Sequence, residues 1–266
     1  EGEILESLLN HGRYRHTERF TAELIESGAR VLTYLHSLRP PIVHRAAYEK
    51  KHSVVLRYPE PSRFGYASVS STSDALTRVI EAYDVEAILT INEDSCLETL
   101  NIATDTSGLD VPVWPIVPNM SRFVREVTER GVVGSQIRRF MKLGARSQMG
   151  LMLRYLPKVF RLARNDFVAG LLLLVEMEIT RFKSHRIGCV VLGSQITELA
   201  LAFENRRLLT EFFDMVQNRY RVPVGLMTSN LGLLSTRLNA WHLKADVIVT
   251  PGISIGIHVL RERERR

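Results

Sequence analysis

The sequence predicts an α/β protein built on a parallel sheet, and the stretch from 222 to 252 supports this prediction most clearly. An apolar run at 224–227 is followed by apolar residues spaced three and four apart between Leu231 and Leu243, and a second apolar run covers 246–249. This succession of patterns indicates a strand, a helix and a second strand. Two buried strands joined by a helix run parallel, and such crossovers are almost always right-handed.

The same alternation of strand and helix extends through most of the chain. Short apolar runs predict five earlier strands, at 29–35, 53–58, 86–91, 111–117 and 186–192. Helical spacing predicts helices at 17–27, 73–83, 96–103 and 197–218. Ser73 is the expected N-cap of the second helix, and Pro115 is awkward for a central strand. The run at 171–175 would be an eighth strand, but its leucines favour a buried helix over 167–182.

Composition places the chain among ordinary globular proteins. Of its 266 residues, 45% are hydrophobic and 24% are charged. The longest apolar run, Phe167–Val175, is too short to span a bilayer, and no basic start with an apolar core indicates a signal peptide. Cys96 and Cys189 match no metal-binding spacing, so we expect free buried thiols. These features predict a cytoplasmic protein without a transmembrane segment.

The basic character is concentrated in a predicted helical insertion at 120–185. Between Met120 and Arg186 there are fourteen Lys and Arg against five Asp and Glu, an excess larger than the net charge of +6 of the whole chain. Such a segment can form a subunit contact, cover an anionic substrate, or contact an anionic membrane or nucleic acid. Its many apolar residues favour packing, and no nucleic-acid-binding module accompanies the charge. We therefore expect a homo-oligomer contact with a lid role.

Polar residues follow nearly every predicted strand. In a parallel α/β sheet the carboxyl ends of the strands share one edge, and ligands bind at that edge. Exposure of loops to water would also make such positions polar. The whole set of positions therefore supports a ligand site more strongly than any single residue does. The candidate substrate-binding residues are Asn92, Asn119, Ser194, Gln195, Thr228, Ser229, Asn230, Thr250 and Gly252.

Glu93, Asp94 and His36 are the candidates for catalysis. The two adjacent carboxylates follow the strand at 86–91, where they can hold a divalent metal or act as a general base. His36 follows the first strand and can be a ligand or a proton shuttle. Helix capping is the competing explanation for the carboxylates, because acids are favoured at helix starts. A divalent metal is therefore a candidate cofactor, with no ligands assigned.

Two loops near the end of the sequence are candidates for binding phosphate. Thr228–Gly232 leads into a helix, and Thr250–Gly256 is glycine-rich, although ordinary turn chemistry also explains both. No lysine ends a predicted strand, which disfavours a Schiff-base mechanism. The P-loop, HExxH and GxSxG patterns are absent.

In element order, strand ends and size, the chain resembles the aldolase-type (β/α)8 barrels, outside Met120–Phe182. The resemblance includes no family motif, so no catalytic residue is carried over. It implies a single TIM-barrel-like domain over 1–266, a parallel β/α barrel of seven or eight strands with the helical insertion. The alternative is a doubly wound open parallel sheet, although LHSLRPP replaces its usual glycine-rich turn after the first strand.

These features predict a barrel enzyme of lyase or isomerase type. Its substrate would be a small anionic metabolite, phosphorylated compounds included, and its chemistry acid/base or metal-assisted. The alternative is a non-catalytic ligand-binding or regulatory protein whose basic insertion contacts a partner.

Overall fold

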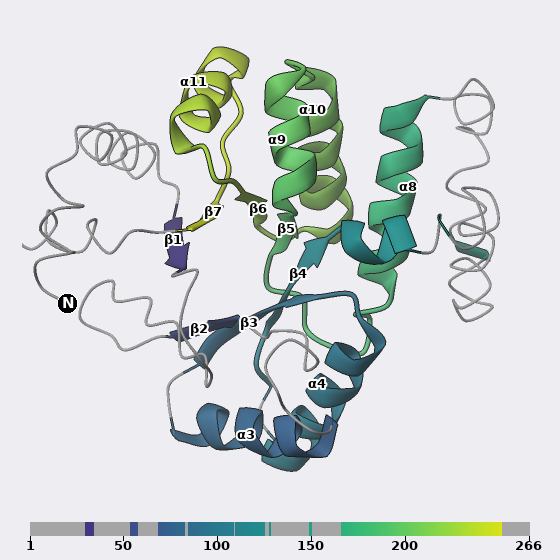
Figure 1. Cartoon of the computed structure of the whole chain (residues 1–266), viewed down its shortest axis with the longest axis vertical. Coiled ribbons are helices and arrows are strands. Elements are labelled where there is room, and N and C mark those ends of the chain that lie inside the picture. Colours follow the sequence, from purple (N-terminus) through teal and green to yellow (C-terminus); the bar gives the residue numbers. More distant parts are fainter. Residues whose placement is uncertain are drawn as a thin grey trace, which may run out of the picture.

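The structure is a computed structural model, and it describes residues 30–34, 54–57, 69–82, 85–108, 110–125, 128, 149–150 and 166–251. Within these residues there is one sheet with helices packed against it (Figure 1). The strands are β1 (Arg30–Tyr34), β2 (Val54–Arg57), β3 (Val85–Ile91), β4 (Val113–Val117), β5 (Val190–Leu192), β6 (Val224–Met227) and β7 (Val247–Pro251). The helices are α3 (Val69–Ala82), α4 (Asp94–Ser107), α8 (Phe167–Thr180), α9 (Ser194–Ala202), α10 (Arg206–Met215), the π-helical turn η3 (Val216–Tyr220) and α11 (Leu231–Trp241).

All neighbouring strands in the sheet are parallel, and their order is β1-β7-β6-β5-β4-β3-β2. From β2 to β7 each strand lies beside the next strand of the chain, and β1 pairs with β7. The first two strands, β1 and β2, are therefore the two edges of the sheet, and the predicted alternative of an open parallel sheet fits this order. In Figure 1 the strands trace an arc whose two ends are β1 and β2.

The predicted α/β class and parallel sheet are confirmed, and the sheet is curled. Within the described residues no pairing joins β1 to β2, so the sheet is open between its first two strands. A curled open parallel sheet describes the observed pairing, and a closed barrel is not shown.

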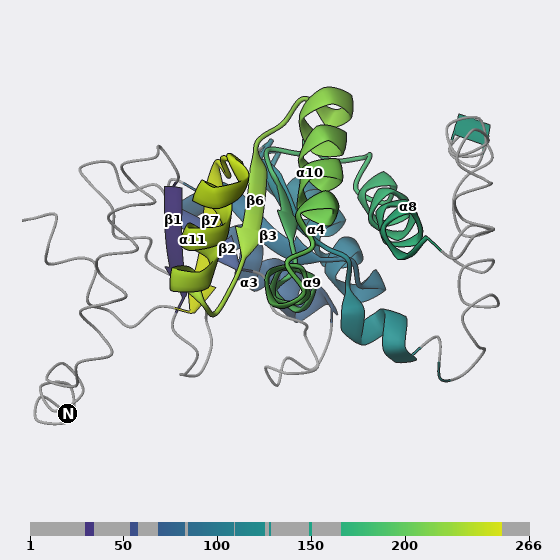
Figure 2. The ribbon, with the colours of Figure 1, turned by 90° about the horizontal axis from the view of Figure 1, so that it is seen from above.

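The two faces of the sheet bury different partners. Along β5, Val190 and Leu192 pack among residues of α8 to α11, whereas Cys189 and Val191 point to the other face. Among the described residues, the cluster on that inner face consists of strand residues and Cys189, which precedes β5, and it contains no helix residue. Its members are Ala87, Leu89, Trp114, Ile116, Cys189, Val191, Met227, Val247 and Val249. The sheet must curl to bury this face, and the helices accordingly lie on the outer side (Figure 2).

The predicted buried helix over 167–182 is confirmed as α8, and the alternative strand at 171–175 is wrong. Asp166 caps the helix, since its Oδ1 accepts hydrogen bonds from the backbone N–H groups of Val168 and Ala169. The helix is buried over most of its length, including the side chains of Glu176 and Glu178. The amino-acid sequence alone does not indicate which residues these two acids contact.

Several predicted helix boundaries are wrong. The predicted helix 197–218 is interrupted after α9, where Glu204 has a positive φ of 50° and the side chain of Asn205 caps α10. Ser73 lies inside α3 instead of capping it, because the helix already begins at Val69. Helix α4 begins at Asp94 and continues to Ser107, so it is longer at both ends than the predicted 96–103.

The predicted strands agree with the structure more closely than the predicted helix boundaries do. Pro115 does lie in a central strand, since β4 pairs with both β3 and β5, and it stands opposite Thr90 of β3. The predicted strand at 186–192 is shorter: only Val190–Leu192 form β5, and Ile187 makes an isolated bridge to Val113. Both cysteines are buried and form no disulfide, as predicted.

Other predictions lie partly or wholly outside the described residues. These include the helix at 17–27, His36, Gly252 and most of the insertion at 120–185. Among the helices that are described, none has the length and the apolarity needed to cross a membrane.

Candidate functional site

Most of the predicted site residues lie along one edge of the sheet. Asn92–Asp94 follow β3, Asn119 follows β4, Ser194–Gln195 begin α9 after β5, and Thr228–Asn230 follow β6. Thr250 lies near the end of β7. Since these strands are parallel neighbours, their carboxyl ends meet at the same edge. Two separate groups of polar contacts form there.

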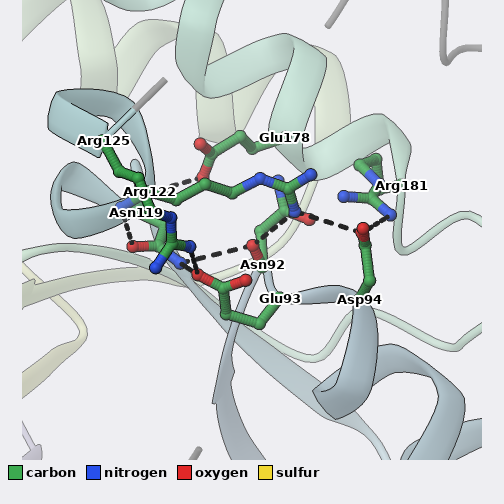
Figure 3. A network of polar contacts seen from close by, with 8 residues as sticks. All are labelled: Asn92, Glu93, Asp94, Asn119, Arg122, Arg125, Glu178 and Arg181. Atoms are coloured by element: carbon green, nitrogen blue, oxygen red, sulfur yellow. Dashed lines mark hydrogen bonds and ion pairs between the residues drawn. The ribbon is translucent and has the colours of Figure 1, made fainter. Parts of the chain in front are cut away.

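The first group, which we call the arginine–carboxylate network, joins the ends of β3 and β4 to α8 (Figure 3). It consists of Asn92, Glu93, Asp94, Asn119, Arg122, Arg125, Glu178 and Arg181. The sequence-based prediction had named the first four of these residues as site candidates. The structure brings all four together.

Asn119 is the centre of the network because its backbone and its side chain bond in three directions. Its backbone N–H donates to Glu178 Oε2 at 2.8 Å, which joins the end of β4 to α8. Its Nδ2 donates to Glu93 Oε1 at 3.0 Å and to the Asn92 carbonyl at 3.3 Å. Its Oδ1 accepts from the backbone N–H of Arg122 at 3.1 Å and so caps the helical turn at 120–125.

Glu93 is held from two sides. Besides Asn119, Arg125 Nη2 donates to Glu93 Oε1 at 3.1 Å. The Glu93 side chain is only 14% exposed, whereas that of Arg125 is 55% exposed. Glu93 stands at the N-cap position of α4, but its side chain makes no capping hydrogen bond. Helix capping therefore does not explain its side-chain contacts, which are directed to Asn119 and Arg125.

Asp94, the first residue of α4, binds two other arginines. Arg122 Nη1 lies 3.2 Å and Arg181 Nη2 lies 2.6 Å from Asp94 Oδ1. Arg122 also donates to the Asn92 carbonyl at 3.1 Å, and its side chain is 7% exposed. A buried guanidinium is tolerated only when it is paired and hydrogen-bonded, and Arg122 meets this condition.

One buried acceptor in the network has no donor. Asn92 is 2% exposed, and its Oδ1 accepts no hydrogen bond from the described residues. An unsatisfied buried polar atom costs about 1–3 kcal/mol.

Four members of the network were not predicted as site residues: Arg122, Arg125, Glu178 and Arg181. Two signals could have identified three of them. Arg122 and Arg125 stand three residues apart directly after a strand end, which places them on one helical face. Glu178 is an acid inside an almost wholly apolar helix, where a buried carboxylate needs a specific partner.

The second group of contacts lies at the ends of β5 and β6 and centres on Glu198 of α9. Glu198 Oε1 accepts from Thr228 Oγ1 and from the backbone N–H of Ser229, both at 2.7 Å. Thr228 Oγ1 in turn accepts from the Asn230 backbone N–H at 2.9 Å, and Asn230 Oδ1 caps α11 by accepting from Leu233. Glu198 was not among the predicted residues.

The contacts of this second group disfavour the expected binding of phosphate at the loop after β6. The loop donors that would bind a phosphate, the N–H groups of Ser229 and Asn230, already donate to oxygen atoms of the chain itself. Of the other predicted residues, Ser194 Oγ and Gln195 Oε1 are 3.5 Å apart, and Thr250 is buried.

The predicted divalent metal stays a prediction. Across the described part of the chain, no three His, Cys, Asp or Glu side chains come together in a way that could hold a metal ion. The carboxylates of Glu93 and Asp94 contact arginines instead.

Comparisons with known proteins give no family for this chain. No protein-family model matches it, and neither the curated proteins nor the solved structures contain a significant match.

Proposed function

We propose that the protein is an acid/base enzyme, of lyase or isomerase type, that acts on a small anionic metabolite at the carboxyl edge of its sheet. The observation that supports this most directly is the convergence of Asn92, Glu93, Asp94 and Asn119 with three arginines at one place on that edge. Parallel α/β folds bind ligands at this edge.

Glu93 is the proposed proton-transferring residue. A general base must be held in a fixed orientation, and Asn119 and Arg125 both bond to Glu93 Oε1. Neither of these contacts uses the second carboxylate oxygen, Oε2. In the proposed reaction Oε2 takes a proton from substrate, while Oε1 stays bonded to Asn119 and Arg125.

The remaining predicted roles extend this proposal. We propose that His36, after β1, is the second proton-transferring group, and that a divalent metal is a candidate cofactor. Because β1 pairs with β7 in parallel, the carboxyl end of β1, after which His36 follows in the sequence, lies at the same edge of the sheet as the other strand ends.

The proposal is tested by combining a binding screen with a proton-exchange assay. Hydroxy acids, keto acids and sugar phosphates are screened by thermal shift, with and without MgCl2, on wild type and on Glu93→Gln. A ligand of the native state raises the midpoint by mass action. Each binder is then incubated with enzyme in D2O, and proton NMR measures deuterium incorporation at its carbon atoms.

We expect at least one compound to stabilise both proteins and to exchange with wild type only. Loss of a general base lowers the rate by about 10²–10⁴-fold. Glu98→Gln is the matched control, because Glu98 is an exposed carboxylate of α4 outside the network. Equal exchange by wild type and Glu93→Gln would exclude the acid/base role. A compound that binds without any chemical change would favour the non-catalytic alternative.

A further inference from the structure

The anionic group of a substrate needs cationic or N–H donors that the chain has not already used. At the end of β6 the N–H groups of Ser229 and Asn230 donate to Glu198 and Thr228. An oxyanion at this loop would have to displace the Glu198 carboxylate, which occupies the place of an anion. The end of β6 is therefore a poor position for the substrate's charge.

Arg125 has unused donors at the same edge of the sheet. A guanidinium has five N–H donors in a planar fork, and that fork matches the geometry of a carboxylate or a phosphate. Within the described residues only Nη2 of Arg125 is engaged, on Glu93, so Nε and Nη1 have no acceptor there. The side chain is 55% exposed, so these donors are accessible to solvent.

The other two arginines of the network are less available. Arg122 is 7% exposed, and its Nη1 is shared between Asn92 and Asp94. Arg181 is 23% exposed and donates to Asp94 at 2.6 Å. Both arginines are nevertheless fixed positive charges beside Asp94, and they offset the negative charge of the neighbouring carboxylates.

The position of Arg125 is fixed by the chain. It lies on the helical turn that Asn119 caps, and Asn119 is itself bonded to Glu178 of α8. Arg122 and Arg125 lie three residues apart, so both point from one face of this turn toward the end of β3, where they meet Asp94 and Glu93 (Figure 3).

We propose that Arg125 binds the oxyanion of the substrate, carboxylate or phosphate, and holds it beside Glu93. This inference rests on the proposed function and deepens it, because it moves anion binding from the loop after β6 to the helical turn after β4. Arg125 would then bridge the substrate's anion and the Glu93 carboxylate with different donors of one guanidinium.

The chain contains a matched control for this proposal. Arg186 is also 55% exposed and also pairs with a carboxylate, that of Asp110, at 2.6 Å. It precedes β5, and Asp110 precedes β4, so this ion pair lies at the opposite, amino-terminal edge of the sheet. The variants Arg125→Gln and Arg186→Gln remove the same charge from side chains of equal exposure.

The test is the affinity for inorganic phosphate, measured by titration calorimetry on the full chain at constant ionic strength. We expect Arg125→Gln to weaken binding at least about tenfold, since a hydrogen bond to a charged group is among the stronger ones. Arg186→Gln should stay within about twofold of wild type, because surface charges far from a site are screened. Glu93→Gln should bind equally or more tightly, since it removes a negative charge beside the anion.

Three outcomes would overturn the proposal. The first is an equal loss in the two arginine variants, which would indicate a non-specific charge effect. The second is a loss in Thr228→Val with none in Arg125→Gln, which would return the anion to the loop after β6. The third is the absence of saturable binding by wild type. Circular dichroism confirms that each variant is folded.

Failure of this inference is distinguishable from failure of the proposed function. The proposed function fails when Glu93→Gln still exchanges deuterium, whatever the affinity for phosphate. The inference about Arg125 fails on phosphate affinity alone. One combined outcome is phosphate binding that depends on Arg125 together with unchanged deuterium exchange in Glu93→Gln. That outcome would support the anion site at Arg125 and reject the catalytic role of Glu93.

Discussion

At the scale of single residues, the buried polar groups of the sheet edge differ in how fully they are hydrogen-bonded. Asn92 is one extreme, because its buried Oδ1 has no donor within the described residues. Active sites commonly keep such costs, since function and stability place different demands on the same residue. Glu178 is the opposite case, a buried carboxylate whose partner holds the site together.

We predict that Asn92→Leu is neutral or stabilises the fold by up to about 1 kcal/mol. Leucine has a similar branched shape, and replacing an unsatisfied buried polar group removes its desolvation cost. Urea unfolding of the variant and of wild type measures the difference. A loss of more than about 2 kcal/mol would show that Asn92 makes a stabilising contact.

Removal of Glu178 should have the opposite effect. We expect Glu178→Ala to lower the free energy of unfolding by about 2–4 kcal/mol, because the buried Asn119 N–H loses its acceptor and a cavity forms. Glu178→Gln keeps an oxygen in place and should cost less. Chemical denaturation of both variants gives the comparison, and equal costs would contradict the hydrogen-bond explanation.

At the scale of elements, capping side chains and residues with a positive φ decide where α9 ends and α10 begins. The predicted helix 197–218 is apolar on one face throughout, so hydrophobic spacing alone did not reveal its interruption. The interruption is made by Glu204 in the left-handed region and by Asn205, whose Oδ1 accepts from the Leu208 N–H at 3.1 Å. Asn205 therefore separates α9 from α10.

We predict a graded response at Asn205. Asn205→Ala should destabilise the protein by about 1 kcal/mol, and Asn205→Gly by only a few tenths, which is the known order for helix N-caps. Thermal or urea unfolding of the two variants provides the measurement. If alanine and glycine cost the same, the side-chain oxygen of Asn205 is not the source of the stabilisation.

At the scale of the whole molecule, the curl of the sheet has a direct structural consequence. Within the described part of the chain the inner face is packed without helix residues, and it leaves no room for a side chain at Gly225. A Cβ atom at this position would lie 2.7 Å from Val191 Cγ2 and 3.2 Å from Cys189 Sγ. A flat sheet with helices on both faces would bury the same residues against helices instead.

Gly225→Ala should therefore destabilise the protein by about 1–3 kcal/mol through overpacking. The double variant Gly225→Ala with Val191→Ala should recover part of that loss relative to the sum of the single variants, because the two positions are in contact. Urea unfolding of all four proteins completes the cycle. Additive effects would indicate that the two side chains do not share the same space.

The sequence by itself determined the class, the strands and part of the candidate site. Short apolar runs and leucine-rich segments are local properties, so the parallel strands and α8 could be predicted, and polar residues after strands indicated Asn92, Glu93, Asp94 and Asn119 as candidates. Predicted helix boundaries were wrong at Ser73, because α3 already begins at Val69, and at Glu204, because a positive φ ends α9 there.

Only the tertiary structure decided which groups meet. Glu178 is 59 residues from Asn119, and Arg181 is 87 residues from Asp94. No local pattern encodes such pairs, because they form when parallel strands align their carboxyl ends and α8 packs beside β4. The choice between Arg125 and the loop after β6 as the anion site is of the same kind. It depends on which donors remain unused after folding, and that is a property of the folded molecule alone.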